Sequence, residues 1–260
     1  MKESTAYFKR KLLWVKERTR LTGNELIREG LTHLLFFACA FFCSRAGINE
    51  KYLPFGLSAA AGTPFNYMPA AGLGAMLGYI FPVTGEGGFR YIAAVLSIMA
   101  IRLLTAKIKF TRESPLFATF ITLLSAFFTG VATLRGLPGG VAFAGVEAAL
   151  AGGGAYFLHK GSLAALNSET GLSNQQLTCF VISLSVVLAG LSRLSVGGIS
   201  VGRVIFIVFI LVAAHRSGAG AGAVFGVAAS LSASSVGAPS AALIMLGFGG
   251  LMAGDFSGIG

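Results

Sequence analysis

The sequence predicts an all-α protein, a polytopic bundle of transmembrane helices, and three observations carry that prediction. Only 12% of the 260 residues are charged and 55% are hydrophobic, whereas a soluble domain carries about 25% charged residues. The hydrophobic residues form successive apolar blocks separated by short breaks. The basic residues gather near the N-terminus instead of covering the chain evenly. Most of the surface is therefore expected to face lipid.

The N-terminal segment, residues 1–28, is strongly basic. Phe8, Leu12 and Val15 recur there at helical spacing, and the single tryptophan, Trp14, lies beside this apolar stripe. The pattern is typical of a helix lying on the membrane surface; a solvated cytosolic tail is the alternative. The segment holds eight of the chain's 20 Lys and Arg residues, namely Lys2, Lys9, Arg10, Lys11, Lys16, Arg18, Arg20 and Arg28.

Residues 29–260 form the predicted transmembrane domain, with about ten spans. The expected spans are 29–46, 51–63, 68–83, 88–105, 114–135, 138–158, 175–194, 197–215, 217–234 and 238–258. A helix needs about 20 residues to cross the hydrocarbon core, so the second and third blocks are short. Pro54, Pro64 and Pro69 interrupt this region. It could form two short helices, a re-entrant pair or one kinked span. The longest loop is expected at 159–174.

The distribution of basic residues predicts the orientation of the spans. With the N-terminus in the cytosol, 14 Lys and Arg residues fall on the cytosolic side and six on the other. This excess favours a cytosolic N-terminus, and an even number of spans puts the C-terminus there too. Merging the second and third spans would move Lys160 and the basic residues from Arg102 to Arg112 outside, so ten spans are favoured.

Glycine is frequent, with 36 residues in the chain, and it recurs at helical spacing inside the spans. Small residues let helix backbones approach closely in lipid. Such faces could serve packing within the bundle or self-association of the chain. The candidate packing glycines are Gly74, Gly78, Gly218, Gly222, Gly226, Gly250 and Gly254.

Glu147 is the one acidic residue near the middle of a predicted span. An ionised carboxylate there is costly, so it is expected to be paired or protonated. Arg102 and Arg203, near span ends, are candidate partners, and Asp255 is a further charge near the cytosolic end of the last span. Three roles remain: a structural or assembly pair, a proton or ion transport site, or a protonated carboxyl bonded to the backbone.

No catalytic, nucleotide-binding or metal-binding motif stands out. The run from Gly218 to Gly222 lacks the third glycine of a dinucleotide loop, and the chain has no HExxH motif. The three cysteines, Cys39, Cys43 and Cys179, lie in apolar runs and are expected to be small buried hydrophobes. The net charge of +10 comes from residues flanking apolar blocks, which suits anionic lipid rather than nucleic acid.

Several stretches resemble the membrane region of stage II sporulation protein E. They are Ser44-Arg45-Ala46, Leu53-Pro54-Phe55-Gly56-Leu57, Tyr91-Ile92-Ala93-Ala94, the small-residue run from Gly218 to Gly226, and Phe248-Gly249-Gly250-Leu251-Met252-Ala253-Gly254-Asp255-Phe256. The resemblance covers about residues 30–260. It implies a membrane anchor followed by a cytosolic regulatory segment and a protein phosphatase 2C-like domain, which activates the first forespore sigma factor from the polar division septum.

The resemblance also sets the expected function. The phosphatase domain, with its manganese or magnesium, would begin beyond Gly260, so this chain is expected to carry no enzyme activity and no cofactor. Its expected role is anchoring, localisation and oligomerisation in the bacterial plasma membrane. The expected partners are the lipid bilayer, other copies of the chain and division-septum proteins. The alternative is a small-molecule or ion transporter using Glu147, although the sequence shows no sign of the two related halves typical of many transporters.

Overall fold

The computed structural model describes residues 23–47, 52–80, 87–136, 138–166, 173–197, 199–212 and 226. The chain divides into two compact units, Met1–Leu35 and Phe36–Gly260. Helix α2 (Gly23–Arg45) begins in the first unit and ends in the second. In the first unit, Ile27 and Leu31 of α2 expose more than half of their surface. Such apolar side chains are stable in contact with lipid and unfavourable in water.

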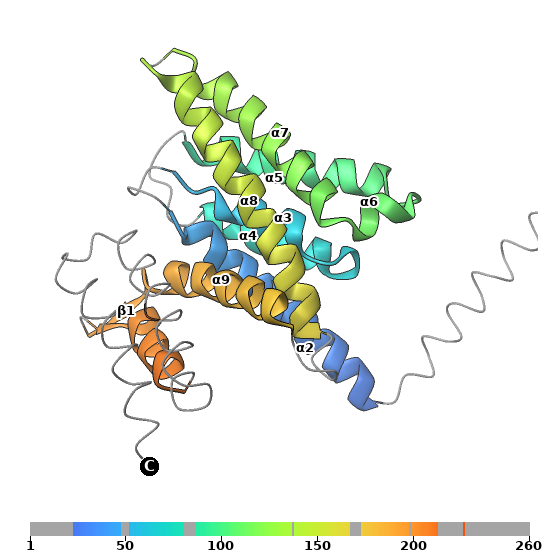
Figure 1. Cartoon of the computed structure of the whole chain (residues 1–260). Coiled ribbons are helices and arrows are strands. Elements are labelled where there is room, and N and C mark those ends of the chain that lie inside the picture. The colour runs from blue at the N-terminus through green and yellow to red at the C-terminus, as the bar shows by residue number, and fades with distance from the viewer. Residues whose placement is uncertain are drawn as a thin grey trace, which may run out of the picture. The chain divides into compact units, whose positions relative to one another are not determined.

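The second unit is helical (Figure 1). Its described elements after α2 are α3 (Phe55–Gly62), the 3₁₀ turn η1 (Phe65–Tyr67), α4 (Met68–Ile80), α5 (Gly87–Leu104), α6 (Lys109–Glu113), α7 (Pro115–Leu134), α8 (Gly140–Leu166), α9 (Asn174–Leu191), β1 (Ser195–Val196), β2 (Ile199–Ser200) and a final helix, Val201–Val212. Strands β1 and β2 form a small antiparallel hairpin. The predicted all-α class therefore holds in the described part of the chain, apart from this hairpin.

Local sequence explains where the longer helices begin. Ser114 precedes α7, accepts a hydrogen bond from the Phe117 amide, and is followed by Pro115 at the first helical position. Ser173 and Gln176 form a reciprocal capping box at the start of α9. Gly139, with a φ of 71°, makes the left-handed turn before α8 that other residues rarely adopt.

The short helix α3 lies at the centre of the second unit. Every residue from Gly56 to Gly62 is buried. The helix packs against α4, α5, α7 and α8. Helices α7 and α8 lie side by side along their lengths (Figure 1). The core is rich in alanine, and several glycines of α3, α4 and α8 are buried, so these backbones approach more closely than leucine-rich helices would.

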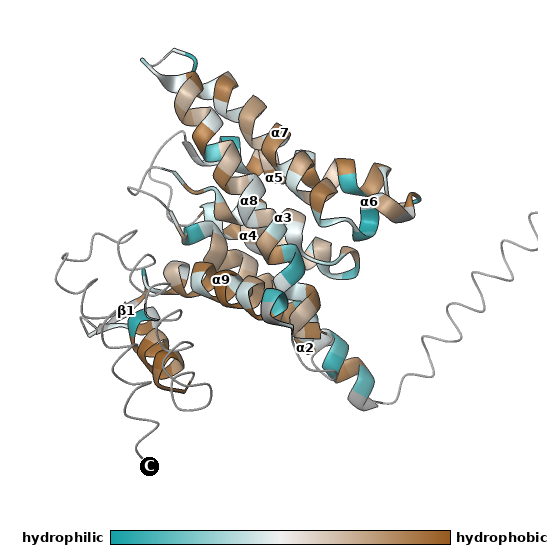
Figure 2. Ribbon diagram, viewed as in Figure 1, coloured by the Kyte–Doolittle hydropathy of each residue, from teal (hydrophilic) through white to brown (hydrophobic). Residues whose placement is uncertain are grey.

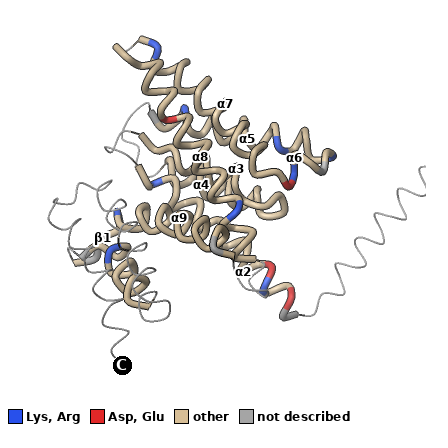
Figure 3. Tube along the Cα trace, in the orientation of Figure 1, with Lys and Arg blue, Asp and Glu red and all other residues tan. Residues whose placement is uncertain are grey.

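The apolar character of the helices continues onto their outer surfaces (Figure 2). Within the described ranges, three helices are long and apolar enough to cross a membrane: Glu25–Arg45, Pro115–Leu134 and Gly140–Leu166. Gln175–Leu191 and Val201–Val212 are shorter apolar helices. Charged residues are sparse along α7 and α9 and more frequent around α6 and the start of α2 (Figure 3). This distribution is the one expected of helices solvated by lipid.

The structure refines several predicted boundaries. The second and third predicted spans are the short helices α3 and α4, with eight and 13 residues. Helix α8 continues to Leu166, so the loop predicted at 159–174 was wrong in its first half. No proline interrupts the stretch after His159, and its alanines and leucines favour a helix. The ninth and tenth predicted spans lie outside the described residues except Gly226; the count of ten and the orientation stay predictions.

Candidate functional site

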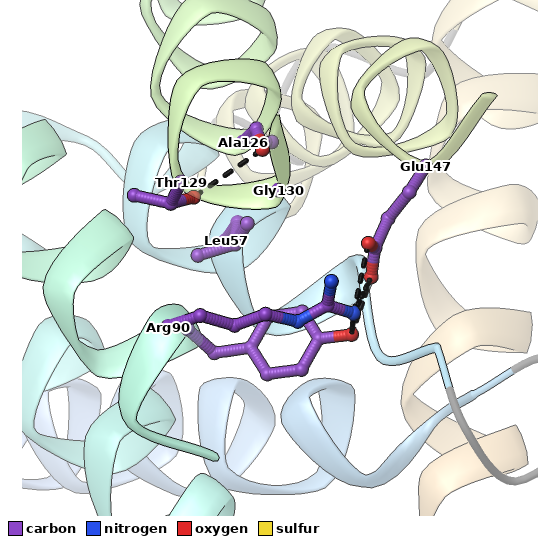
Figure 4. A pocket seen from close by; sticks show the side chains of 7 residues that line it. Leu57, Arg90, Ala126, Thr129, Gly130 and Glu147 are labelled. Carbon is purple, nitrogen blue, oxygen red and sulfur yellow. Dashed lines mark hydrogen bonds and ion pairs between the residues drawn. The ribbon is translucent and has the colours of Figure 1, made fainter. Parts of the chain in front are cut away.

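Glu147 lies in a polar cluster beside the start of α3. The cluster, here called the Glu147 cluster, consists of Glu147 from α8, Arg90 and Tyr91 from the first turn of α5, and Tyr79 from the last turn of α4. Arg90 Nη2 lies 2.9 Å from Glu147 Oε2 and donates to Oε1 at 3.1 Å (Figure 4). Both side chains are only 6% exposed. The charges therefore neutralise each other inside the protein.

The two tyrosines connect this ion pair to the backbone. Tyr91 donates its hydroxyl to Glu147 and accepts from Arg90 and from the Leu53 amide, the last at 2.9 Å. Tyr79 donates to the Leu53 carbonyl at 2.7 Å and accepts from the Leu57 amide at 3.1 Å. Their rings stack with centroids 4.8 Å apart. The cluster thus satisfies backbone groups before and within the first turn of α3, which that helix leaves unpaired.

The described residues pack closely around the pair. The space between Arg90, Glu147 and the neighbouring Thr129 and Gly130 of α7 is too narrow for a water molecule. Arg90 also lies over the Tyr91 ring, 4.4 Å from its centroid, which favours the guanidinium. This buried, hydrogen-bonded ion pair fastens α5 to α8.

The other end of α3 is held by Arg102, which is 3% exposed. Its Nη1 donates to the Ala60 carbonyl at 3.2 Å and to the Thr63 carbonyl at 2.8 Å. The last carbonyls of a helix lack partners within the helix and carry partial negative charge. A buried arginine at this position satisfies both needs. Arg102 is therefore a cap for α3, and its contacts here are with backbone oxygens.

His159 and Ser162 of α8 complete this cap. The His159 Nδ1 lies 3.1 Å from the Gly62 carbonyl oxygen, and its Nε2 lies 3.2 Å from the Glu113 carbonyl oxygen. Ser162 donates to the same Gly62 carbonyl at 3.3 Å. Midway along α3, Ser58 donates to the Ala151 carbonyl of α8 at 2.7 Å. Helix α3 is therefore tied to its neighbours at both ends and in the middle.

The predicted partners of Glu147 were wrong, because the structure pairs it with Arg90. Arg102 contacts carbonyls at the opposite end of α3. Arg203 lies in the helix Val201–Val212, and its Nε is buried and makes no hydrogen bond with another described residue. Sequence alone placed Arg90 in an outer segment. It could not show that the first turn of α5 lies beside the second turn of α8.

Two of the predicted packing glycines face α2. A Cβ added to Gly74 would lie 2.2 Å from the Phe37 carbonyl oxygen, and one added to Gly78 would lie 2.5 Å from the Phe41 carbonyl oxygen. Both glycines therefore serve close packing within the chain. Gly226 is buried. The remaining predicted candidates lie outside the described residues, namely Gly218, Gly222, Gly250, Gly254 and Asp255.

Tyr79, Tyr91 and His159 were missed as site residues. A partial signal existed for Tyr91, since a tyrosine follows an arginine at the start of a span, where both polar groups need partners. His159 gave no signal because it was assigned to a loop. Within the described ranges, no group of three or more His, Cys, Asp or Glu residues is arranged to hold a metal ion.

These features define a class of protein: a helical, membrane-associated module whose buried polar groups hold its own helices together. The chain belongs to the SpoIIE N-terminal domain family, whose model matches residues 3–257. The match confirms the resemblance to stage II sporulation protein E inferred from the sequence. No curated protein and no solved structure matches the chain.

Proposed function

We propose that this chain is a multi-pass membrane anchor that localises and assembles a sporulation phosphatase at the polar division septum. The family match over residues 3–257 is the observation that carries the proposal. In this role the chain provides position rather than chemistry. Manganese or magnesium would be needed only by the phosphatase domain, which activates the first forespore sigma factor.

The contacts at the two ends of α3 support the proposal that this chain is a rigid scaffold. Arg90 and Arg102 lie about 18 Å apart along α5, at about 1.5 Å per residue, and a hydrocarbon core is about 30 Å thick. At least one of the two polar ends is then within the hydrocarbon when the bundle spans a membrane. Irregular backbone at that depth is stable only when other protein groups form hydrogen bonds with its N–H and C=O groups. The Glu147 cluster and the Arg102 cap supply those groups.

Septal targeting is tested with a fluorescent protein fused after Gly260 in sporulating cells. We expect fluorescence at the polar septum, because the membrane region carries the localisation. The control fuses the same fluorescent protein to an unrelated polytopic membrane domain, which reports the extra membrane present at any septum. Equal septal enrichment of the two fusions would reject septal targeting by this chain.

The transporter alternative has its own test. Liposomes containing the purified chain and a pH-sensitive dye are placed in a proton gradient, beside protein-free liposomes. The closed packing around Glu147 predicts the same leak rate in both. A faster leak that disappears in Glu147→Gln would favour transport over anchoring.

A further inference from the structure

The connection between α5 and α7 carries exposed apolar side chains beside exposed basic ones. Leu104, the last residue of α5, is 84% exposed, and Phe110 of α6 is 71% exposed. Ile108, just before α6, is more than half exposed. Lys107 and Arg112 are exposed in the same stretch, and the basic positions around α6 stand out in Figure 3. These five residues are called the α6 patch below.

Hydrogen bonds hold this connection in place. The Thr111 hydroxyl lies 2.8 Å from the carbonyl oxygens of both Thr105 and Ile108 and can donate to either. The Glu113 carbonyl oxygen lies 3.2 Å from His159 Nε2 of α8. The connection is thus fastened within itself and to a neighbouring helix. The exposure of the α6 patch is therefore a property of the folded chain.

Neither water nor the hydrocarbon core suits the side chains of this connection. Leu104 and Phe110 are unfavourable in water. The charges of Lys107, Arg112 and the exposed Glu113 are costly in hydrocarbon. The boundary between acyl chains and headgroups suits both kinds, because apolar side chains enter the acyl region there while long basic side chains reach the headgroups.

The exposed apolar surface continues from the α6 patch onto α7. Leu116, in the first turn of α7, and Phe120, four residues later, are both more than half exposed. Residues four apart lie on the same face of a helix. Helix α7 is long and apolar enough to cross a membrane. The lipid expected around α7 therefore extends to the α6 patch.

The charges of the connection favour anionic lipid over neutral lipid. Lys107, Lys109 and Arg112 outnumber the single acid, Glu113. Arg112 donates to Asn66 Oδ1 at 3.0 Å. A guanidinium has several donors, so Arg112 can keep this contact and bind a lipid phosphate as well.

We propose that the α6 patch binds the surface of an anionic phospholipid membrane. Leu104, Ile108 and Phe110 enter the outermost part of the acyl region. Lys107 and Arg112 bind headgroup phosphates, to which basic groups at a membrane surface are attracted. The inference rests on the membrane-anchor function proposed above, and it adds the depth at which this end of the bundle lies.

The depth is measured by tryptophan fluorescence of the full chain in liposomes of phosphatidylcholine and phosphatidylglycerol. Trp14→Phe removes the single tryptophan, and Phe110→Trp places a reporter in the α6 patch. We expect strong quenching by lipid brominated near the headgroup end of its acyl chains and weak quenching by aqueous acrylamide, because the reporter side chain lies in lipid. Strong quenching by acrylamide and none by brominated lipid would overturn the site and leave the patch for a protein partner.

The preference for anionic lipid is measured with the same reporter. A small fraction of brominated phosphatidylglycerol or of brominated phosphatidylcholine is mixed into unbrominated phosphatidylcholine, and the brominated phosphatidylglycerol should quench at the lower fraction. K107Q/R112Q should lower this preference at least about fivefold, since each basic group at the surface contributes roughly that factor. The matched control is Arg135→Gln, an exposed arginine at the opposite end of α7, which should leave the preference unchanged.

The remaining outcomes separate the site from the anchor. If K107Q/R112Q does not fold because the contact with Asn66 is lost, Lys107→Gln alone should still lower the preference by a smaller factor. Equal quenching by the two brominated lipids in the wild type, or an equal loss in Arg135→Gln, would overturn the site. A chain that stays soluble without detergent and does not enter liposomes would instead refute the membrane anchor, on which the site rests.

Discussion

At the scale of single residues, the pairing of Glu147 with Arg90 decides what the intramembrane acid can do. The carboxylate is neutralised by one guanidinium and hydrogen-bonded by Tyr91. Removing one partner leaves a buried charge unpaired, which is strongly destabilising. Replacing both partners by apolar residues often costs little, because no unpaired charge is left. Glu147 and Arg90 should therefore behave as one unit in mutational experiments.

Glu147→Gln and Arg90→Gln should each lower the free energy of unfolding by about 3 kcal/mol, because each strands a buried partner. The double variant R90Q/E147Q should cost clearly less than the two single effects added together. The measurement is denaturation in mixed micelles followed by intrinsic fluorescence. Glu113→Gln, whose side chain is exposed, is the control and should leave stability unchanged. Additive single effects would contradict the coupling.

At the scale of helices, α3 shows how an eight-residue helix survives inside a bundle. A helix this short is unstable in isolation, since few of its backbone groups pair within it. Tyr79 and Tyr91 satisfy groups around its start, and Arg102 and His159 satisfy its end. The neighbouring α4 relies instead on close packing, because Gly74 and Gly78 let it touch the α2 backbone.

Gly74→Ala should lower the free energy of unfolding by about 1–3 kcal/mol through overpacking. The added Cβ would lie 2.2 Å from a backbone oxygen of α2, which cannot rotate away as a side chain can. The matched control is Gly153→Ala in α8, where nothing lies within 4 Å of the new Cβ. The control should be neutral or slightly stabilising, because alanine favours helices. Equal stability of the two variants in detergent would contradict the α2–α4 contact.

At the scale of the whole molecule, the side of the membrane reached by the α3–α4 connection determines how the spans are counted. Arg112 of α6 donates to Asn66 Oδ1 in η1 at 3.0 Å. This contact puts the α3–α4 connection at the same end of the bundle as the α5–α7 connection. If α3 and α4 each cross the membrane, Arg102 and Lys160 lie on the side of the N-terminus, as the charge distribution predicts. If the two helices form one kinked span, Arg102 and Lys160 lie on the opposite side.

Topology is measured with a membrane-impermeant maleimide on intact cells, in a variant whose Cys39, Cys43 and Cys179 are replaced by alanine. Asn66→Cys and Lys107→Cys should be labelled only after the membrane is opened. Arg135→Cys, in the connection between α7 and α8, should be labelled in intact cells. All three positions are exposed in the structure. Labelling of Asn66→Cys and Lys107→Cys from opposite sides would rule out the shared end.

The sequence by itself determined the class of the protein, the approximate positions of most described helices, and the family. The class and the helix positions follow from composition and from apolar blocks, which are local in the chain, and the family follows from the resemblance of several short stretches. The sequence also singled out Glu147, because an acid in an apolar block is conspicuous. Only the tertiary structure decided its partner, the ends of α3 and the roles of Tyr79 and His159. Those contacts join residues far apart in the chain, and the spacing of residues along a sequence does not encode which helices become neighbours.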